Sequence, residues 1–141
     1  MKVILDTNII LDVLLQRAPN AESAANIFEL AIDNEIEALI TANSVTDIFY
    51  IIAKRLGKPM ARDALQHLLN IVGIVGIDRG DCQTALDLPI TDFEDALVVA
   101  CSIKEGITTI ISNDLEFSSL CTPYVQIVSS EKYLSLFKSN L

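Results

Sequence analysis

The sequence lacks a long apolar run. No stretch approaches the roughly 18–20 consecutive apolar residues that a membrane-spanning helix requires. Near the N-terminus, the apolar residues Val3–Leu5 are followed at once by Asp6, so a charge interrupts any hydrophobic core of a secretion signal. We therefore expect a cytoplasmic protein that does not associate with a membrane.

Cysteine and histidine are scarce. The three cysteines, Cys82, Cys101 and Cys121, are odd in number and far apart in the sequence, which argues against a disulfide scaffold and a thiolate metal site. The single histidine, His67, lies in an apolar helical pattern. A hydrolytic mechanism that uses one histidine as acid and another as base is therefore excluded.

Basic residues are also few. Ten lysines and arginines stand against 19 aspartates and glutamates, for a net charge of −9. Proteins that bind nucleic acid nonspecifically are normally basic, because neutralising phosphates supplies their affinity. Acids gathered around a metal ion would not repel a nucleic acid in the same way. Four of the bases, Lys54, Arg55, Lys58 and Arg62, fall within one short segment that could supply a local basic patch.

Repeats, low-complexity segments and linkers rich in proline, glycine or serine are absent. The 141 residues match the usual size of one domain, and 51% of them are hydrophobic, which is enough for a sizeable core. We therefore predict a single domain, residues 1–141.

Short apolar runs alternate with longer helical patterns. The runs are rich in isoleucine and valine and apolar on both faces, as in parallel strands that are covered on both sides. They are Val3–Leu5, Ile36–Ile40, Ile74–Ile77, Thr108–Ile111 and Val125–Val128. Alternation of this kind predicts an α/β fold: a three-layer α/β/α sandwich with a mostly parallel sheet of about five strands.

Two helix starts carry capping patterns. Ser44–Asp47 predicts a helix that ends at Gly57. Thr91–Glu94 predicts a second helix, with Thr91 as the N-cap and Glu94 at the third helical position, ending at Gly106.

Acidic residues follow the strands or begin the helices at one edge of the predicted sheet, where open parallel sheets bind ligands. They are Asp6, Asp47, Asp95 and Asp114, from four distant segments. Carboxylates brought together repel one another unless some are protonated or a divalent cation binds. A site made of carboxylate oxygens suits Mg²⁺ or Mn²⁺, and a water on such an ion can attack a phosphodiester.

Four segments together resemble the motifs of the PIN-domain family, in order and at similar spacing. They are Asp6–Asn8 after the first strand, Thr41–Tyr50, Asp92–Ala96 and Ile111–Phe117. The resemblance covers nearly the whole chain and extends to short bacterial PIN proteins, including VapC-like toxin ribonucleases.

The resemblance implies roles for single residues. Asp6, Asp95 and Asp114 would be metal ligands, directly or through water, while Asn8 and Ser112 would support the site or contact phosphate. Asp47 would be the fourth catalytic acid, although the family usually has glutamate there, so the shorter side chain would need a bridging water. Three neighbours in sequence are further candidates for supporting the site or binding substrate: Asp12, Asp92 and Asn113.

The resemblance also implies an activity and partners. It implies an endoribonuclease dependent on Mg²⁺ or Mn²⁺, the toxin of a toxin–antitoxin pair, which forms homodimers and binds an antitoxin protein. Residues 44–72 carry more apolar side chains than one helix face needs, which predicts that this helical pair contributes to the dimer interface unless the two helices cover each other.

Three alternatives compete with this interpretation. A phosphatase of the haloacid-dehalogenase type needs a second acid two residues after the first, where this sequence has Asn8. A receiver domain would use Asp78 but needs an acidic pair and a lysine that are missing. A PIN scaffold that binds RNA or protein with little or no catalysis is compatible with Asp47 and with the acidic charge.

Overall fold

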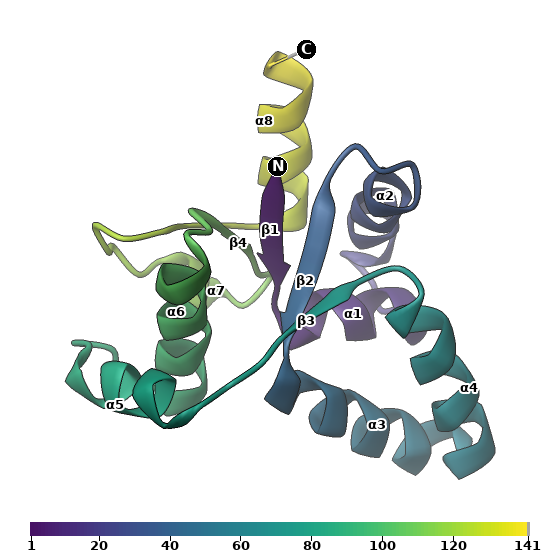
Figure 1. The fold of residues 1–141 in the computed structure, drawn as a ribbon. Helices are drawn as coiled ribbons and strands as arrows, with labels where there is room; N and C mark the ends of the chain where they lie inside the picture. The colour runs from purple at the N-terminus through teal and green to yellow at the C-terminus, as the bar shows by residue number, and fades with distance from the viewer. Residues whose placement is uncertain (141) are drawn as a thin grey trace.

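The computed structural model describes residues 1–140, and these residues form one sheet of five strands with eight helices (Figure 1). The strands are β1 (Lys2–Leu5), β2 (Glu37–Thr41), β3 (Gly73–Val75), β4 (Thr109–Ile111) and β5 (Gln126–Val128). The helices are α1 (Thr7–Leu14), α2 (Ala21–Ile32), α3 (Ala42–Leu56), α4 (Lys58–Leu69), α5 (Arg79–Asp87), α6 (Phe93–Glu105), α7 (Leu115–Ser118) and α8 (Ser130–Ser139). Leu141, the last residue of the predicted domain 1–141, lies outside the described residues, and the single domain stays a prediction.

All strand pairs in residues 1–140 are parallel, and the strand order is β3-β2-β1-β4-β5. The order reverses at β1, since the chain runs from β1 to one edge of the sheet and then returns to β4 on its other side. This is the switch point at which open parallel sheets form a crevice beyond their carboxyl ends. Asp6 immediately follows β1 and therefore lies at that point.

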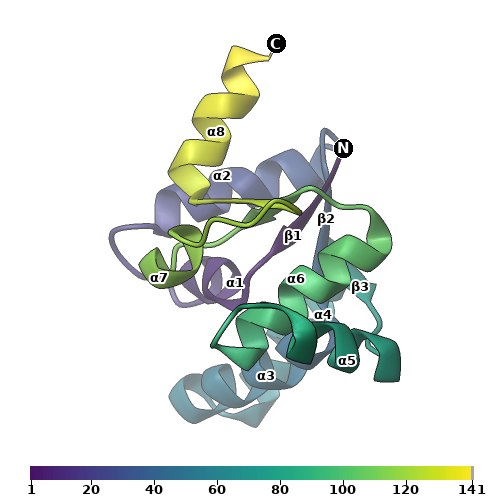
Figure 2. The same cartoon turned by 90° about the vertical axis from the view of Figure 1, so that its left-hand side faces the viewer.

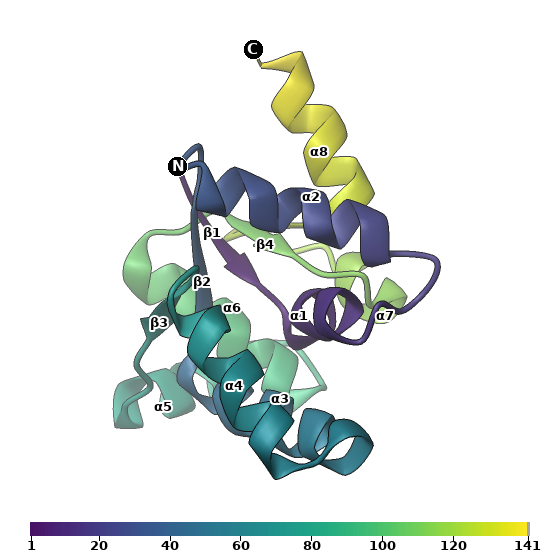
Figure 3. The same ribbon diagram turned by 90° about the vertical axis from the view of Figure 1, so that its right-hand side faces the viewer.

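Both faces of the sheet are covered. Along β1, Val3 and Leu5 belong to one apolar cluster and Ile4 to another, because successive side chains of a strand point to opposite faces. Helices α1 to α4 and α8 cover the first face, seen from their side in Figure 3. Helices α6 and α7 cover the second face, and α5 packs on α6, as Figure 2 shows from that side. The predicted α/β/α sandwich with about five strands is confirmed, and the sheet is entirely rather than mostly parallel.

Each predicted strand is present, with ends that shift by one or two residues. The largest shift is in the third, predicted as Ile74–Ile77 and observed as Gly73–Val75. Here the apolar pattern continues past the last residue that pairs with β2, so Ile77 packs beside the sheet and is not part of it.

The predicted start of α3 is wrong. The helix begins at Ala42 with Thr41 as its N-cap residue, so β2 passes into α3 without a loop and Ser44 lies inside the first turn. Ser44 is buried, and its hydroxyl accepts a hydrogen bond from Thr7 Oγ1 at 3.2 Å instead of capping the helix. Asp47 therefore lies in the second turn, not the first.

The cap assigned to α6 is also wrong. Asp92, not Thr91, is the N-cap residue, and its Oδ1 accepts a hydrogen bond from the backbone N–H of Asp95 at 3.0 Å. Thr and Asp are both favoured N-cap residues, but a cap one residue later places Asp95, rather than Glu94, at the third helical position. The predicted end at Gly106 is confirmed, where Gly106 has a left-handed backbone with φ of 67°.

Helices α3 and α4 pack against each other through buried Ile48, Ile52, Ala61 and Leu68. This mutual cover accounts for part of the apolar excess seen in the sequence. Five large apolar side chains remain exposed on the pair: Tyr50, Ile51, Leu56, Met60 and Leu69. A homodimer through this surface therefore stays a prediction. No helix in residues 1–140 has the length and apolarity needed to cross a membrane.

Candidate active site

The acids predicted to converge line one open pocket of about 480 Å³ at the carboxyl edge of the sheet. The six acidic residues among its lining are Asp6, Asp47, Asp92, Glu94, Asp95 and Asp114. They come from the end of β1, from α3, from the start of α6 and from the loop after β4. The structure thus brings together all four predicted catalytic acids, together with Asp92, which had been predicted to support them.

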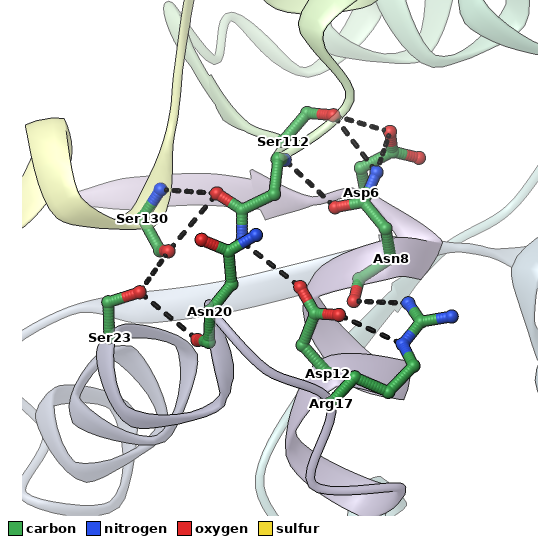
Figure 4. Close-up of polar contacts among 9 residues, drawn as sticks. Asp6, Asn8, Asp12, Arg17, Asn20, Ser23, Ser112 and Ser130 are labelled. Carbon is green, nitrogen blue, oxygen red and sulfur yellow. Dashed lines mark hydrogen bonds and ion pairs between the residues drawn. The ribbon is translucent and has the colours of Figure 1, made fainter.

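Asp6 is fixed on both of its oxygens. Oδ1 accepts a hydrogen bond from the backbone N–H of Thr7 at 2.9 Å, so that Asp6 also caps α1. Oδ2 accepts hydrogen bonds from Ser112 Oγ at 2.8 Å and from Asn8 Nδ2 at 3.1 Å (Figure 4). Carboxylates with several donors are held in one orientation, which is the requirement for placing an oxygen on a cation.

Ser112 joins the two aspartates that follow neighbouring strands. Its hydroxyl is fully buried, donates to Asp6 and accepts from the backbone N–H of Asp114 at 3.1 Å. Asn8 donates to the same hydroxyl at 3.1 Å and accepts from the backbone N–H of Asn113 at 2.9 Å. The predicted supporting roles of Asn8 and Ser112 have this geometric basis: both residues hold the Asp114 loop against Asp6.

Four other acids of the pocket lie at helix N-termini. Asp92 caps α6, and Glu94 and Asp95 lie in the first turn of that helix. Asp114 caps the short helix α7, with Oδ1 accepting from the backbone N–H of Glu116 at 2.9 Å. Acids at helix N-termini are stabilised by the helix dipole, so each has a structural role as well as its place in the pocket.

Three carboxyls in the pocket, those of Asp6, Glu94 and Asp95, have raised pKa values. The pKa of Asp95 is raised from its ordinary 3.8 to about 7, first by burial and then by the charges of Asp92, Asp6, Asp114 and Glu94. Burial is also the largest cause of the raised pKa of Asp6, to which Asp114 adds, although hydrogen bonds from Ser112 and Thr7 oppose it.

Glu94 is affected in the same way. Its pKa is raised by burial and then by the charges of Asp47, Asp92 and Asp6. The charge of Asp47 is therefore close enough to the Glu94 carboxyl to raise its pKa. Carboxyl pKa values raised by burial and by neighbouring negative charges are typical of functional sites, where like charges are held together for a ligand.

The donor set fits a hydrated divalent cation. Within residues 1–140, no group of three or more Asp, Glu, His or Cys side chains is arranged to hold a metal ion directly. Mg²⁺, however, usually keeps several of its waters and is bound through one or two carboxylates. The cluster offers hard oxygen ligands and unrelieved negative charge, which suits a cation bound partly through water.

The raised pKa of Asp95 predicts a pH-dependent stability. Between about pH 4 and pH 7 the folded protein keeps a proton that the unfolded chain has lost, so the free energy of unfolding should fall as the pH rises through this range. The fall should be smaller with millimolar MgCl₂ than with EDTA, because a cation favours the charged form. Melting temperatures measured across this pH range test the prediction. In Asp95→Asn the loss of stability with rising pH should be smaller, and an unchanged loss in that variant would contradict the assignment of this pH dependence to Asp95.

Three predicted residues lie behind the pocket rather than in its lining: Ser112, Asp12 and Asn113. Asp12 is only 6% exposed, and its Oδ2 accepts a hydrogen bond from Asn113 Nδ2 at 3.1 Å. Asn113 Oδ1 in turn accepts from the backbone N–H of Ser130, at the start of α8, at 3.0 Å. Asn113 therefore connects the loop after β4 to α1 and α8.

Sequence reasoning gave no site role to nine of the fifteen lining residues, and three of these nine bear on the chemistry of the pocket. Glu94 was assigned to helix capping alone, although it is next to Asp95 in the motif and could have been included on that ground. Arg17 follows α1 in a segment with no recognisable pattern, and nothing in the sequence signals that it turns back to the pocket. Tyr50, which is 68% exposed at the pocket, was counted only as surplus apolar surface.

The chain is similar to several known proteins over most of its length. A ribonuclease VapC1 from Aquifex aeolicus (strain VF5) is 26% identical over 137 residues, which cover 94% of this chain and 92% of that protein. Among solved structures, VapBC2 from Rickettsia felis bound to a DNA fragment from their promoter gives a TM-score of 0.68 at 20% identity, covering 90% of this chain and 97% of the other.

A second solved structure is VapC20 from Mycobacterium tuberculosis, described as a toxin that cleaves the sarcin–ricin loop. Its TM-score is 0.65 at 17% identity, with 83% of this chain and 93% of the other covered. These two likenesses establish the fold. The family model of the PIN domain matches residues 2–116, a span that contains β1 to β4 and every acid of the pocket. The chain belongs to the PIN-domain family.

Proposed function

We propose that this protein is an endoribonuclease that depends on Mg²⁺ or Mn²⁺ and cleaves RNA phosphodiesters in the acidic pocket. The observation that carries the proposal is the convergence of Asp6, Asp47, Asp95 and Asp114 from four distant segments on one pocket, at the cost of mutual repulsion. Such repulsion destabilises a protein unless a ligand offsets it. The name of the Aquifex relative supports the choice of RNA as substrate.

Asp6, Asp95 and Asp114 would hold the cation, directly or through water. When bound, it would lower the pKa of a coordinated water and neutralise charge that develops on the phosphate. Ser112 and Asn8 keep the Oδ2 of Asp6 in place during this process. In such a reaction the water oxygen would form a bond to phosphorus and one phosphorus–oxygen ester bond would break. The proton of the water would pass to a nearby carboxylate, and the departing sugar oxygen would take a proton from solvent. Asp47 and Glu94 face the pocket and are the acids available for that proton.

Single-stranded or looped RNA is the proposed substrate class. An A-form duplex hides its base edges in a narrow major groove, whereas unpaired nucleotides present both backbone and bases. The exposed ring of Tyr50 at the pocket can stack on an unpaired base. The direct test compares an unstructured RNA oligonucleotide, its duplex and its DNA equivalent in the presence of Mg²⁺. Cleavage of the single-stranded RNA alone is expected, and equal cleavage of the DNA would contradict the assigned substrate.

The proposal extends to partners. The Rickettsia structure is a VapBC complex, which supports an antitoxin partner and a toxin role for this chain. An adjacent small gene encoding a DNA-binding protein that copurifies with this chain would support that role.

A homodimer through α3 and α4 would give twice the chain mass of 15.4 kDa in light scattering. A single species at the chain mass at all concentrations would refute the dimer.

The alternative of a weakly active scaffold depends on Asp47. This residue reaches one methylene less than the glutamate usual in the family, so Asp47→Glu should keep cleavage or raise it by up to about tenfold, which is about 1.4 kcal/mol in the barrier. Single-turnover cleavage rates of the two proteins test this. Asp63→Glu, on the exposed surface of α4, is the matched control and should have no effect. A large loss in Asp47→Glu would mean that the pocket requires the shorter side chain. Membership of the PIN family removes the phosphatase alternative.

A further inference from the structure

Arg17 is the only basic residue that lines the acidic pocket within the described part of the chain. It lies three residues beyond the end of α1, after a turn in which Gln16 has a positive φ of 49°. The backbone N–H of Arg17 donates to the carbonyl oxygen of Asp12 at 3.0 Å, which folds this segment back along α1. The turn therefore returns the side chain of Arg17 to the edge where the carboxylates lie.

The guanidinium is held on one side only. Nε donates to Asp12 Oδ1 at 2.9 Å, and Nη2 donates to the carbonyl oxygen of Asn8 at 3.3 Å (Figure 4). A guanidinium has five N–H donors in a rigid fork, so these two bonds leave three donors on Nη1 and Nη2 without a protein partner among the described residues. These donors belong to a residue of the pocket lining.

The partner that orients Arg17 is itself fixed. Asp12 is 6% exposed, and its second oxygen is occupied by the hydrogen bond from Asn113 Nδ2. Asn113 is held by Ser130 at the start of α8. A buried carboxylate of this kind gives Arg17 a fixed direction at little entropic cost, which a flexible surface arginine lacks. The ion pair with Asp12 explains where the side chain is anchored, but it leaves the free donors unexplained.

RNA that enters this pocket meets a charge problem. A divalent cation can neutralise the phosphate that is cleaved, but the neighbouring phosphate of the strand still faces the remaining carboxylates. Like charges at short range repel by several kcal/mol where water is partly excluded. Arginine binds phosphate through paired N–H donors, and Arg17 presents such donors in the lining. Among residues 1–140, no other residue of the lining carries a positive charge.

We propose that Arg17 binds the RNA phosphate next to the one that is cleaved, and that Asp12 and Asn113 act as positioning residues for its guanidinium. The inference rests on the proposed ribonuclease function and names a binding residue for that substrate. Arg17 provides a single phosphate contact in a pocket that otherwise repels the strand. Its loss weakens binding of every RNA sequence alike, because a phosphate contact carries no base information.

The test measures binding without cleavage. Fluorescein-labelled single-stranded RNA is titrated, with Mg²⁺ present, against Asp6→Asn protein and against the same protein carrying Arg17→Met. We expect the second change to weaken binding about tenfold and to lower the slope of log affinity against log salt by about 0.7, the value for one phosphate contact on a single strand. Arg17→Lys should retain the slope but regain only part of the affinity, since lysine lacks the fork.

A matched control separates this role from general charge. Arg79 is exposed at the start of α5 and lies outside the lining. Arg79→Met should therefore leave the affinity and the salt slope unchanged. In addition, a neutral methylphosphonate linkage can be placed at each position of the RNA in turn. At one position it should weaken binding to the Asp6→Asn protein, and at that same position it should not weaken binding to the protein that also carries Arg17→Met. If Arg17→Met lowers only the melting temperature, with unchanged affinity and slope, Arg17 is a structural residue and the inference is wrong.

These outcomes are distinct from those that test the function. Binding through Arg17 without any cleavage by the unaltered protein would refute the ribonuclease and leave the phosphate contact standing. Cleavage by the unaltered protein at a rate and KM unchanged in Arg17→Met would support the ribonuclease and overturn this inference.

Discussion

Asp6→Asn is expected to lower the rate of RNA cleavage by a factor of about a thousand or more, which corresponds to roughly 4 kcal/mol in the barrier. Asparagine has nearly the same shape but no charge, and it replaces one acceptor oxygen by a donor. The oxygen lost is one of two that are now fixed by Ser112, Asn8 and Thr7. Single-turnover cleavage of labelled RNA at saturating protein measures the loss.

The same substitution should not destabilise the fold. The pKa of Asp6 is raised in the folded protein, so its negative charge costs stability at neutral pH. Removing the charge should leave the melting temperature at pH 7 unchanged or higher. Asp63→Asn, an exposed change on α4, is the control and should alter neither activity nor stability. Activity retained in Asp6→Asn would contradict the proposed site, and a lower melting temperature would mean that the hydrogen bonds to Asp6 outweigh the repulsion.

Asn113→Ala should lower the free energy of unfolding by about 2–3 kcal/mol, and it should also reduce cleavage. The side chain donates to buried Asp12 and accepts from both the backbone N–H and the hydroxyl of Ser130. Alanine would leave one oxygen of Asp12 and the N–H of Ser130 without partners in places where water has little access. Urea unfolding followed by circular dichroism measures the change.

Asn26→Ala gives the matched control for this prediction. Asn26 is exposed on α2, so the change should stay within about 0.5 kcal/mol. If Asn113→Ala were equally mild, the connection between the loop after β4, α1 and α8 would not be important for stability. The orientation of Arg17 through Asp12 would then need another explanation.

The fold was largely predictable from short apolar runs and from their alternation with helical patterns. Short runs such as Val3–Leu5 are apolar on both faces, and only a parallel sheet with helices on both sides satisfies several such runs at once. The same topology places strand ends at one edge, so the convergence of Asp6 and Asp114 followed from their positions after strands. The ends of elements were less predictable: Ile77 continues an apolar pattern beyond the paired residues of β3.

The errors arose where tertiary contacts outweigh local signals. Ser44 matches a capping pattern, but α3 begins directly after β2 and the Ser44 hydroxyl is used by Thr7 and Thr41. No sequence pattern identifies Arg17 as a pocket residue, because the position of its side chain depends on a turn at Gln16 and on the buried carboxylate of Asp12. Local patterns predict which residues form an element, whereas contacts between distant segments decide which side chains reach the site.

The most direct test of the central claim is cleavage of one labelled single-stranded RNA by purified protein under three conditions: with Mg²⁺, with excess EDTA, and with EDTA followed by excess Mg²⁺. Asp6→Asn protein, purified identically, is assayed beside it. We predict cleavage with Mg²⁺, none with EDTA, full recovery when Mg²⁺ is restored, and no cleavage above background by the variant. Equal cleavage with Mg²⁺ and EDTA, or equal cleavage by the two proteins, would contradict a ribonuclease that works through a cation in this pocket.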